Sequence, residues 1–182
     1  DKTFTAAFFT GYHAMRGAYK GVLEHTYHGG VVSDVFFNRK RFGETGMNAA
    51  VAGYFRVPVA LVTGDHVVTE EARLLLGKVE TVTVKEGVGR NAAKCLSPIK
   101  VRSLIKAGAK NALLKVKSFK PLILNPPINV EMVFINAGMA DMAEMVPGSK
   151  RKDGRTVSFI ANDYLEAYKT LRAMIALAGT TV

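Results

Sequence analysis

The run Val57–Asp65 (VPVALVTGD) decides the fold expected for this chain of 182 residues. Its residues up to Thr63 are almost continuously apolar, and Gly64 and Asp65 then end the run. A short apolar run that stops at turn residues is typical of a strand buried on both faces. Both faces of a sheet are buried when helices cover each side of it, so this run indicates an α/β arrangement.

Segments on either side of this run alternate between strand and helix patterns. Strand patterns occur at Phe4–Thr10, Val31–Asn38, Arg41–Phe42, Val79–Lys85, Ile128–Ile135 and Thr156–Ala161. Helical spacing or helix-capping residues occur at Glu44–Phe55, Thr69–Gly77, the long segment that starts at Ser97, Asn136–Met145 and Asp163–Ala178. The alternation predicts the α/β class, with a mixed or mostly parallel sheet flanked by helices.

Turn and capping residues set the expected boundaries of these elements. Gly11 is expected to end the first strand, and residues 38–40 are expected to form a hairpin turn. Thr69 is expected to cap the helix that ends at Gly77, and Ser97 to cap the long helix that follows.

A composition shift at three prolines (Pro121, Pro126 and Pro127) suggests two portions of the chain. Residues 1–120 are expected to form an α/β portion that carries the candidate site described below. Residues 121–182 are expected to form a β-α-β-α portion, either as a smaller α+β subdomain or as part of the same domain.

The bulk composition is that of a soluble globular protein, with 48% hydrophobic and 22% charged residues. The longest apolar runs are too short to span a bilayer, and no secretory signal opens the chain, so we expect no membrane partner. The single cysteine, Cys95, cannot form an internal disulfide and is expected to be a buried, inert thiol. These features favour a cytoplasmic protein.

The formal net charge of +10 raises the possibility of a nucleic-acid partner. Much of this charge lies in one stretch, at Lys100, Arg102, Lys106, Lys110, Lys115, Lys117 and Lys120. Nucleic-acid binding surfaces usually interleave aromatic and basic side chains, and this stretch does not. A solvated outer face of the long helix is therefore the favoured interpretation, and no nucleic-acid partner is expected.

Two histidines and one glutamate are the candidates for chemistry. His13, His25 and Glu44 each lie beside an apolar, strand-like run. Together they offer part of a zinc site and a proton carrier, but too few ligands for a complete hydrolytic metal centre. Other roles stay open: His13 could bond to nearby backbone, and Glu44 could stabilise the N-terminus of its helix.

Other polar residues are weaker candidates. Asn48 follows Glu44 by one helical turn, where it could bind substrate, orient Glu44 or bond to local backbone. His28 follows His25 by three residues, and in an extended segment this spacing sends the two side chains to opposite faces. We therefore expect only one of them to reach the site of His13. Asp65 is expected to make local turn bonds.

Several stretches in the same order along the chain resemble one enzyme family. They are Gly11-Tyr12-His13-Ala14, Glu24-His25-Thr26, Gly43–Ala49 (GETGMNA), Tyr54–Asp65, Val84-Lys85, Gly89-Arg90, Cys95–Pro98 (CLSP) and Asp163–Tyr168 (DYLEAY). Each motif is weak by itself, but their common order is specific. The chain resembles the zinc-dependent D-aminopeptidases.

The resemblance implies an enzyme that removes N-terminal D-amino acids, especially D-alanine, from short peptides. It implies two zinc ions per complete subunit, no organic cofactor, an α/β domain with a smaller domain, and a ring-like homodecamer. By position, His13 and Glu44 match two zinc ligands, and His25 matches a histidine that assists catalysis. His28 has no counterpart, and the resemblance assigns no role to Asn48, although it lies within a family motif.

The chain departs from the family pattern at its start. Family members begin with an Asp-x-Glu-Gly segment on the first strand and carry a further histidine ligand, and neither precedes Gly11-Tyr12-His13 here. We therefore expect an N-terminal segment, with ligands and opening strands, to be missing from this chain. The alternative is a catalytically incomplete family relic that acts as an assembly or binding protein.

Overall fold

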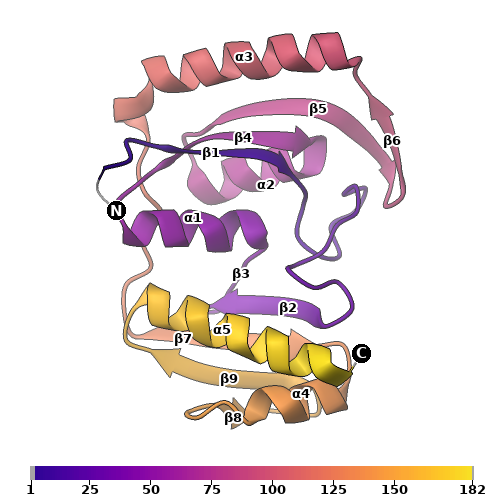
Figure 1. Ribbon diagram of the computed structural model, residues 1–182, viewed down its shortest axis with the longest axis vertical. Coiled ribbons are helices and arrows are strands. Elements are labelled where there is room, and N and C mark those ends of the chain that lie inside the picture. The colour runs from indigo at the N-terminus through magenta and orange to yellow at the C-terminus, as the bar shows by residue number, and fades with distance from the viewer. Residues whose placement is uncertain (1–2, 182) are drawn as a thin grey trace. The chain divides into compact units, whose positions relative to one another are not determined.

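The computed structural model describes residues 3–181, and these form two compact units (Figure 1). The first unit consists of two segments of the chain, the residues up to His25 and Glu44–Ile123. The second consists of Thr26–Gly43 and the chain from Leu124 onward. The division near residue 123 lies close to the proline-rich shift in composition. The early segment Thr26–Gly43, however, belongs with the C-terminal portion, because its strand pairs there.

The first unit is built on a four-stranded sheet whose strand order is β1-β4-β5-β6. Its strands are β1 (Ala7–Tyr12), β4 (Val59–Asp65), β5 (Glu80–Gly89) and β6 (Ala92–Cys95). The first three are parallel, and β6 pairs antiparallel with β5. Every residue of β4 is buried, so the apolar run that indicated the fold forms a strand covered on both faces, as predicted.

Helices cover both faces of this sheet, as Figure 1 shows. Helices α1 (Glu44–Tyr54) and α2 (His66–Leu76) share one apolar cluster with β1 and β4, and α3 (Pro98–Leu114) shares another with β4 and β5. The first cluster contains Phe9, Ala49, Val59, Val62 and Ala72. The second contains Ala60, Leu61, Val82, Ala112 and Phe119, the last of which follows the short 3-10 helix η1 (Val116–Ser118). The α/β class with a mostly parallel, helix-flanked sheet is confirmed.

The second unit contains an antiparallel sheet with two helices, α4 (Ala137–Glu144) and α5 (Tyr164–Ala178). Its strand order is β3 (Lys40–Arg41), β2 (Val32–Phe37), β7 (Ile128–Phe134), β9 (Thr156–Ala161) and β8 (Lys150–Arg151), and the 3-10 helix η2 (Gly179–Thr181) follows α5. The side chains of β7 alternate, with Ile128, Val130, Met132 and Phe134 fully buried. The expected hairpin is present: Asn38 and Arg39 both have positive φ, as a two-residue type I′ turn requires.

Several elements differ from the expected ones. Strand β1 continues through Gly11, whose φ of +73° fits the irregular register between Phe9 and Tyr12. Helix α2 begins at His66 rather than Thr69, because the carboxylate of Asp65 accepts bonds from Val67 N and Val68 N and so caps the helix. The strands β6 and β8 were not expected.

Two surface features complete the description. Cys95 is exposed rather than buried, at the end of the edge strand β6. The seven basic residues from Lys100 to Lys120 are all exposed: four lie on α3, and Lys115, Lys117 and Lys120 follow its end. Over residues 3–181, no helix has both the length and the apolar character needed to cross a membrane.

Helix α1 packs so closely against a crossing chain segment that a glycine is required. A Cβ atom added to Gly53 would lie 1.8 Å from the carbonyl oxygen of Leu122. We predict that Gly53→Ala destabilises the fold by about 2 kcal/mol or more, although alanine normally favours a helix. The measurement is the midpoint of urea unfolding.

The matched control is Gly138→Ala in α4, where the added Cβ would meet only Asn136 Oδ1, at 3.5 Å. This variant should gain up to about 1 kcal/mol from helix propensity. Equal midpoint shifts for the two variants would contradict the packing argument.

Candidate metal centre

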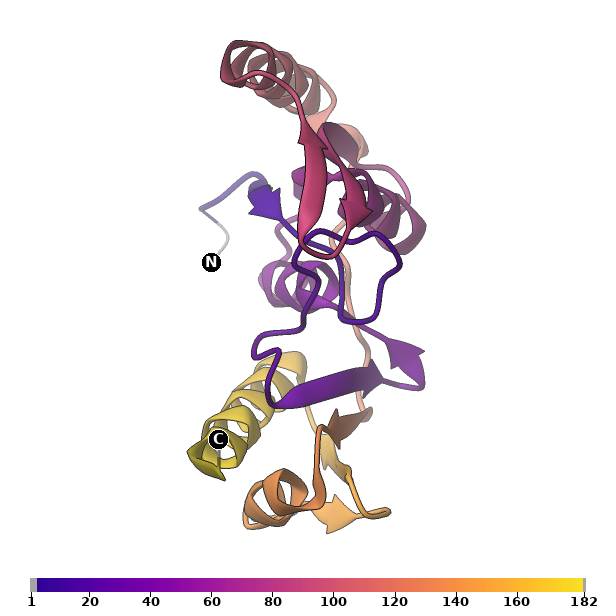
Figure 2. The same cartoon turned by 90° about the vertical axis from the view of Figure 1, so that its right-hand side faces the viewer.

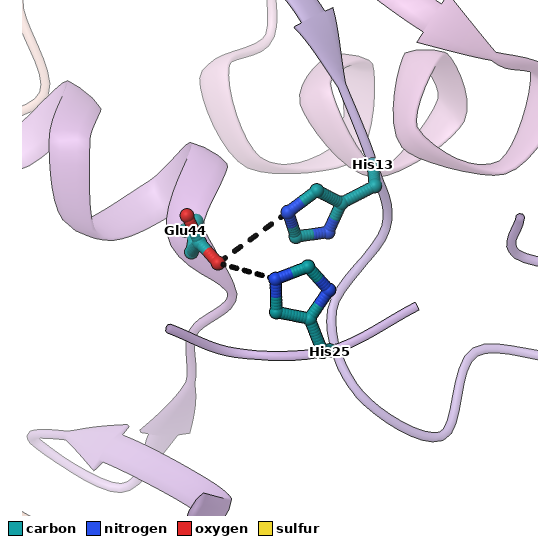
Figure 3. A group of neighbouring side chains, drawn as sticks. All are labelled: His13, His25 and Glu44. Carbon is teal, nitrogen blue, oxygen red and sulfur yellow. Dashed lines mark ion pairs between the residues drawn. The ribbon is translucent and has the colours of Figure 1, made fainter. Parts of the chain in front are cut away.

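Three candidate side chains converge in the first unit, as Figure 3 shows. His13 directly follows β1, Glu44 is the first residue of α1, and His25 comes from the irregular segment after His13. The Nε2 atoms of His13 and His25 lie 3.4 and 3.5 Å from the same oxygen, Glu44 Oε1. The two imidazole rings stack with centroids 3.9 Å apart. Among the described residues, these three form a group that can hold a metal ion.

The backbone fixes which imidazole nitrogen faces Glu44. His13 Nδ1 lies 3.1 Å from the carbonyl oxygen of Ala14, and His25 Nδ1 lies 2.8 Å from that of Leu23. A carbonyl oxygen only accepts hydrogen bonds, so each Nδ1 must carry the proton and donate it. The neutral ring then presents an unprotonated Nε2, which is the form that binds a metal ion.

The separations of the ligand atoms suit zinc. Two atoms that each lie about 2.1 Å from a tetrahedral zinc ion are about 3.4 Å apart. The two distances from Glu44 Oε1, 3.4 and 3.5 Å, match this spacing. Imidazole nitrogen and carboxylate oxygen are both ordinary zinc ligands. The residues present therefore fit a zinc ion.

The pKa of His13 reflects the same neighbours. The Glu44 carboxylate beside Nε2 raises the pKa of His13 above its ordinary value of 6.5, while partial burial acts in the opposite direction. The carbonyl of Ala14 and the charge of Glu71 add to the increase. A proton on Nε2 occupies the lone pair that a metal ion would use, so protons compete with metal binding at His13.

Helix α2 anchors the segment that links the two histidines. Glu71 Oε2 accepts a bond of 2.8 Å from Met15 N, and Asp65 Oδ2 accepts one of 2.9 Å from Val22 N. Asp65 makes the local turn bonds expected of it, and this longer-range bond was not anticipated. The one signal in the sequence is the acidic type of both residues, Asp65 at the predicted turn after the strand and Glu71 near the start of the predicted helix.

The remaining candidates have other environments. Asn48 Nδ2 donates to the hydroxyl of Tyr12 at 2.9 Å, and Tyr12 stacks on Phe9, so Asn48 is tied to the strand that leads to His13. His28 is exposed and belongs to the second unit, whereas His25 joins the His13 group. The nitrogen Nδ1 of His66 accepts a bond from Gly87 N.

Comparisons with known proteins show which family the chain resembles. A family model described as D-aminopeptidase (peptidase M55) matches residues 1–173. The D-aminopeptidase of Bacillus subtilis strain 168 is 41% identical over 184 residues, which include all of this chain and 66% of that protein. A solved structure, "Zn-dependent D-aminopeptidase DppA from Bacillus subtilis, a self-compartmentalizing protease", superposes with a TM-score of 0.94 at 40% identity.

That superposition covers 98% of this chain and 65% of the solved chain. The chain thus spans about two thirds of the length of these relatives. The family match extends over nearly all of its residues, and the identity is far above the level of chance. The resemblance found in the sequence motifs is confirmed: the chain belongs to the D-aminopeptidase family, peptidase M55.

Proposed function

We propose that this chain carries the catalytic metal site of a zinc-dependent aminopeptidase. The observation that supports this most strongly is the approach of two imidazole Nε2 atoms to one oxygen of Glu44. In the proposal, His13 and Glu44 are zinc ligands and His25 carries a proton during hydrolysis. The named relatives favour this function over a catalytically incomplete relic.

The chemistry divides between the metal and the chain. A bound zinc ion supplies Lewis acidity, which polarises a peptide carbonyl and makes water more acidic. His13 and Glu44 hold the ion through Nε2 and Oε1. Because Leu23 holds the Nδ1 proton of His25, its Nε2 accepts a proton and passes it to the leaving amine. About one third of the His25 side chain is exposed (33%), which leaves a path to solvent.

The finer parts of the proposal extend the names of the relatives and the resemblance in the sequence motifs. The substrates are short peptides with N-terminal D-amino acids, as the name of the curated relative suggests. A complete subunit binds two zinc ions, with His13 and Glu44 among their ligands. Subunits assemble into a homodecamer, which is one way to build a self-compartmentalising protease such as the solved relative. A cytoplasmic location agrees with the free thiol of Cys95. Asn48 is kept as a weak candidate for substrate contact.

The ligand roles predict how zinc content changes. We expect His13→Ala and Glu44→Ala to lower zinc affinity by about 100-fold or more, because each removes a ligand atom and not merely a supporting group. Zinc per chain after dialysis against a weak chelator is the measurement. His28→Ala, which removes an exposed imidazole, is the matched control and should keep wild-type zinc. Normal zinc in Glu44→Ala would remove that residue from the centre.

The proton-carrier role predicts a different result for His25. We expect His25→Ala to lower turnover of D-alanyl amides by about 10²- to 10⁴-fold, the usual contribution of general acid–base catalysis. Zinc content should stay near the wild-type value. A parallel assay with L-alanyl amides tests the stereochemistry. If His25→Ala loses zinc together with activity, His25 is a third ligand and not a proton carrier.

The raised pKa of His13 predicts a pH dependence for the metal-free chain. A raised folded-state pKa stabilises the fold fully below the unfolded pKa of about 6.5, and the contribution disappears as pH rises through the folded-state pKa. Between about pH 6 and 8, the unfolding free energy of wild type should therefore fall relative to His13→Gln. Urea unfolding at several pH values measures this, and parallel curves for the two proteins would contradict the assignment.

A further inference from the structure

The segment that carries His25 holds an unfavourable backbone conformation. Leu23, two residues before His25, has a φ of +52°, in the left-handed region that bulky side chains rarely adopt. Its carbonyl oxygen accepts the bond from His25 Nδ1. Such a conformation costs free energy and persists only when neighbouring groups hold it. The orientation of the His25 ring thus depends on whatever fixes Leu23.

One residue, Arg90, contacts both residues that precede His25. Arg90 lies in the turn between β5 and β6, which Figure 2 shows beside the irregular segment after β1. Its carbonyl oxygen accepts a bond of 2.8 Å from Leu23 N, and its guanidinium Nε donates to Glu24 Oε1 at 3.1 Å. The Leu23 residue therefore bonds through its N–H to Arg90 and through its carbonyl to His25.

Glu24 extends this connection across the segment. Its second carboxylate oxygen accepts a bond of 2.5 Å from Gly17 N, and only 14% of its side chain is exposed. Gly17 itself has a positive φ, at a bend of the same segment. The carboxylate of Glu24 thus connects the bend at Gly17 to the hairpin turn at Arg90. Glu24 is the residue immediately before His25.

We propose that Arg90 is a positioning residue that fixes the ring orientation and tautomer of His25 through Leu23 and Glu24. This inference rests on the proposed function for its effect on turnover. Arg90 contacts neither Glu44 nor His13 in the described contacts, so it acts through His25. An exposed ion pair contributes little to stability, and 54% of the Arg90 side chain is exposed. Loss of the Arg90–Glu24 pair should therefore change the orientation of His25 much more than the free energy of unfolding.

Histidine NMR tests the orientation without any activity measurement. In the metal-free chain, the neutral His25 ring should carry its proton on Nδ1, which faces the Leu23 carbonyl. Arg90→Ala keeps the backbone carbonyl that accepts from Leu23 N but removes the guanidinium that pairs with Glu24. Without that pair Glu24 no longer steadies the neighbouring Leu23 carbonyl, so the fraction of this tautomer should fall. Glu24→Gln, a gentler change, should move the fraction in the same direction.

Kinetics of the zinc-loaded chain test the effect on turnover. A misplacement of about 1 Å can cost about 100-fold in rate, so we expect Arg90→Ala to lower kcat by at least about tenfold. In a His25→Ala background the same change should alter kcat less than about twofold, since coupled residues act as one unit. Arg90→Lys, which can still pair with Glu24, should recover part of the loss.

Arg73→Ala is the matched control. Arg73 forms an ion pair of the same length, 3.1 Å, with Glu70, and its side chain is similarly exposed (48%). This variant should leave the His25 tautomer and kcat unchanged.

Two results would overturn the proposal: an unchanged tautomer in both Arg90→Ala and Glu24→Gln, or an equal loss of kcat with and without His25. If the wild-type chain hydrolyses no aminoacyl amide, the proposed function fails, and the NMR comparison still decides the positioning role.

Discussion

The positions of two imidazole protons decide what the candidate centre can do. The carbonyl oxygens of Ala14 and Leu23 hold the Nδ1 protons of His13 and His25, so both Nε2 lone pairs face Glu44. With either ring in the opposite tautomer, an N–H would point at Glu44 and that histidine could not coordinate an ion there. Glu44 begins α1, so a negative charge on its carboxylate lies at the positive end of the helix dipole.

The strand that indicated the fold also anchors the site. Asp65, the last residue of β4, is fully buried and uses one carboxylate oxygen to cap α2 and the other to hold Val22. One helical turn and a half later, Glu71 holds Met15. The segment that delivers His25 has no regular structure of its own, so its shape is set by these side chains. The precision of the site therefore derives from the sheet and α2, although His25 itself lies outside both.

Local patterns predicted most elements but not their long-range partners. The cap at Ser97 was readable because proline and a helical pattern follow it directly. Asp65 and Thr69 are both good capping types, and only the backbone turn after β4 decides in favour of Asp65. The segment Thr26–Gly43 joins the C-terminal portion because β2 pairs with β7. These strands are separated by about a hundred residues, so no local sequence pattern predicts their pairing. For the same reason the sequence did not predict a role for Arg90, whose partner Glu24 lies far away along the chain.

Backbone strain is concentrated where the candidate chemistry is. Six described non-glycine residues have positive φ, and three of them (Lys20, Leu23 and Tyr27) lie within a few residues of His25, whereas Arg56 lies just after α1. At Asn38 and Arg39 the same backbone region is simply what a tight hairpin requires. The segment around His25 forms no hairpin, so hydrogen bonds to Asp65, Glu71 and Arg90 must offset the strain. Hydrogen bonds, rather than burial, hold this segment, so they can fix the His25 ring while it stays open to solvent. A proton carrier needs both a fixed position and access to solvent.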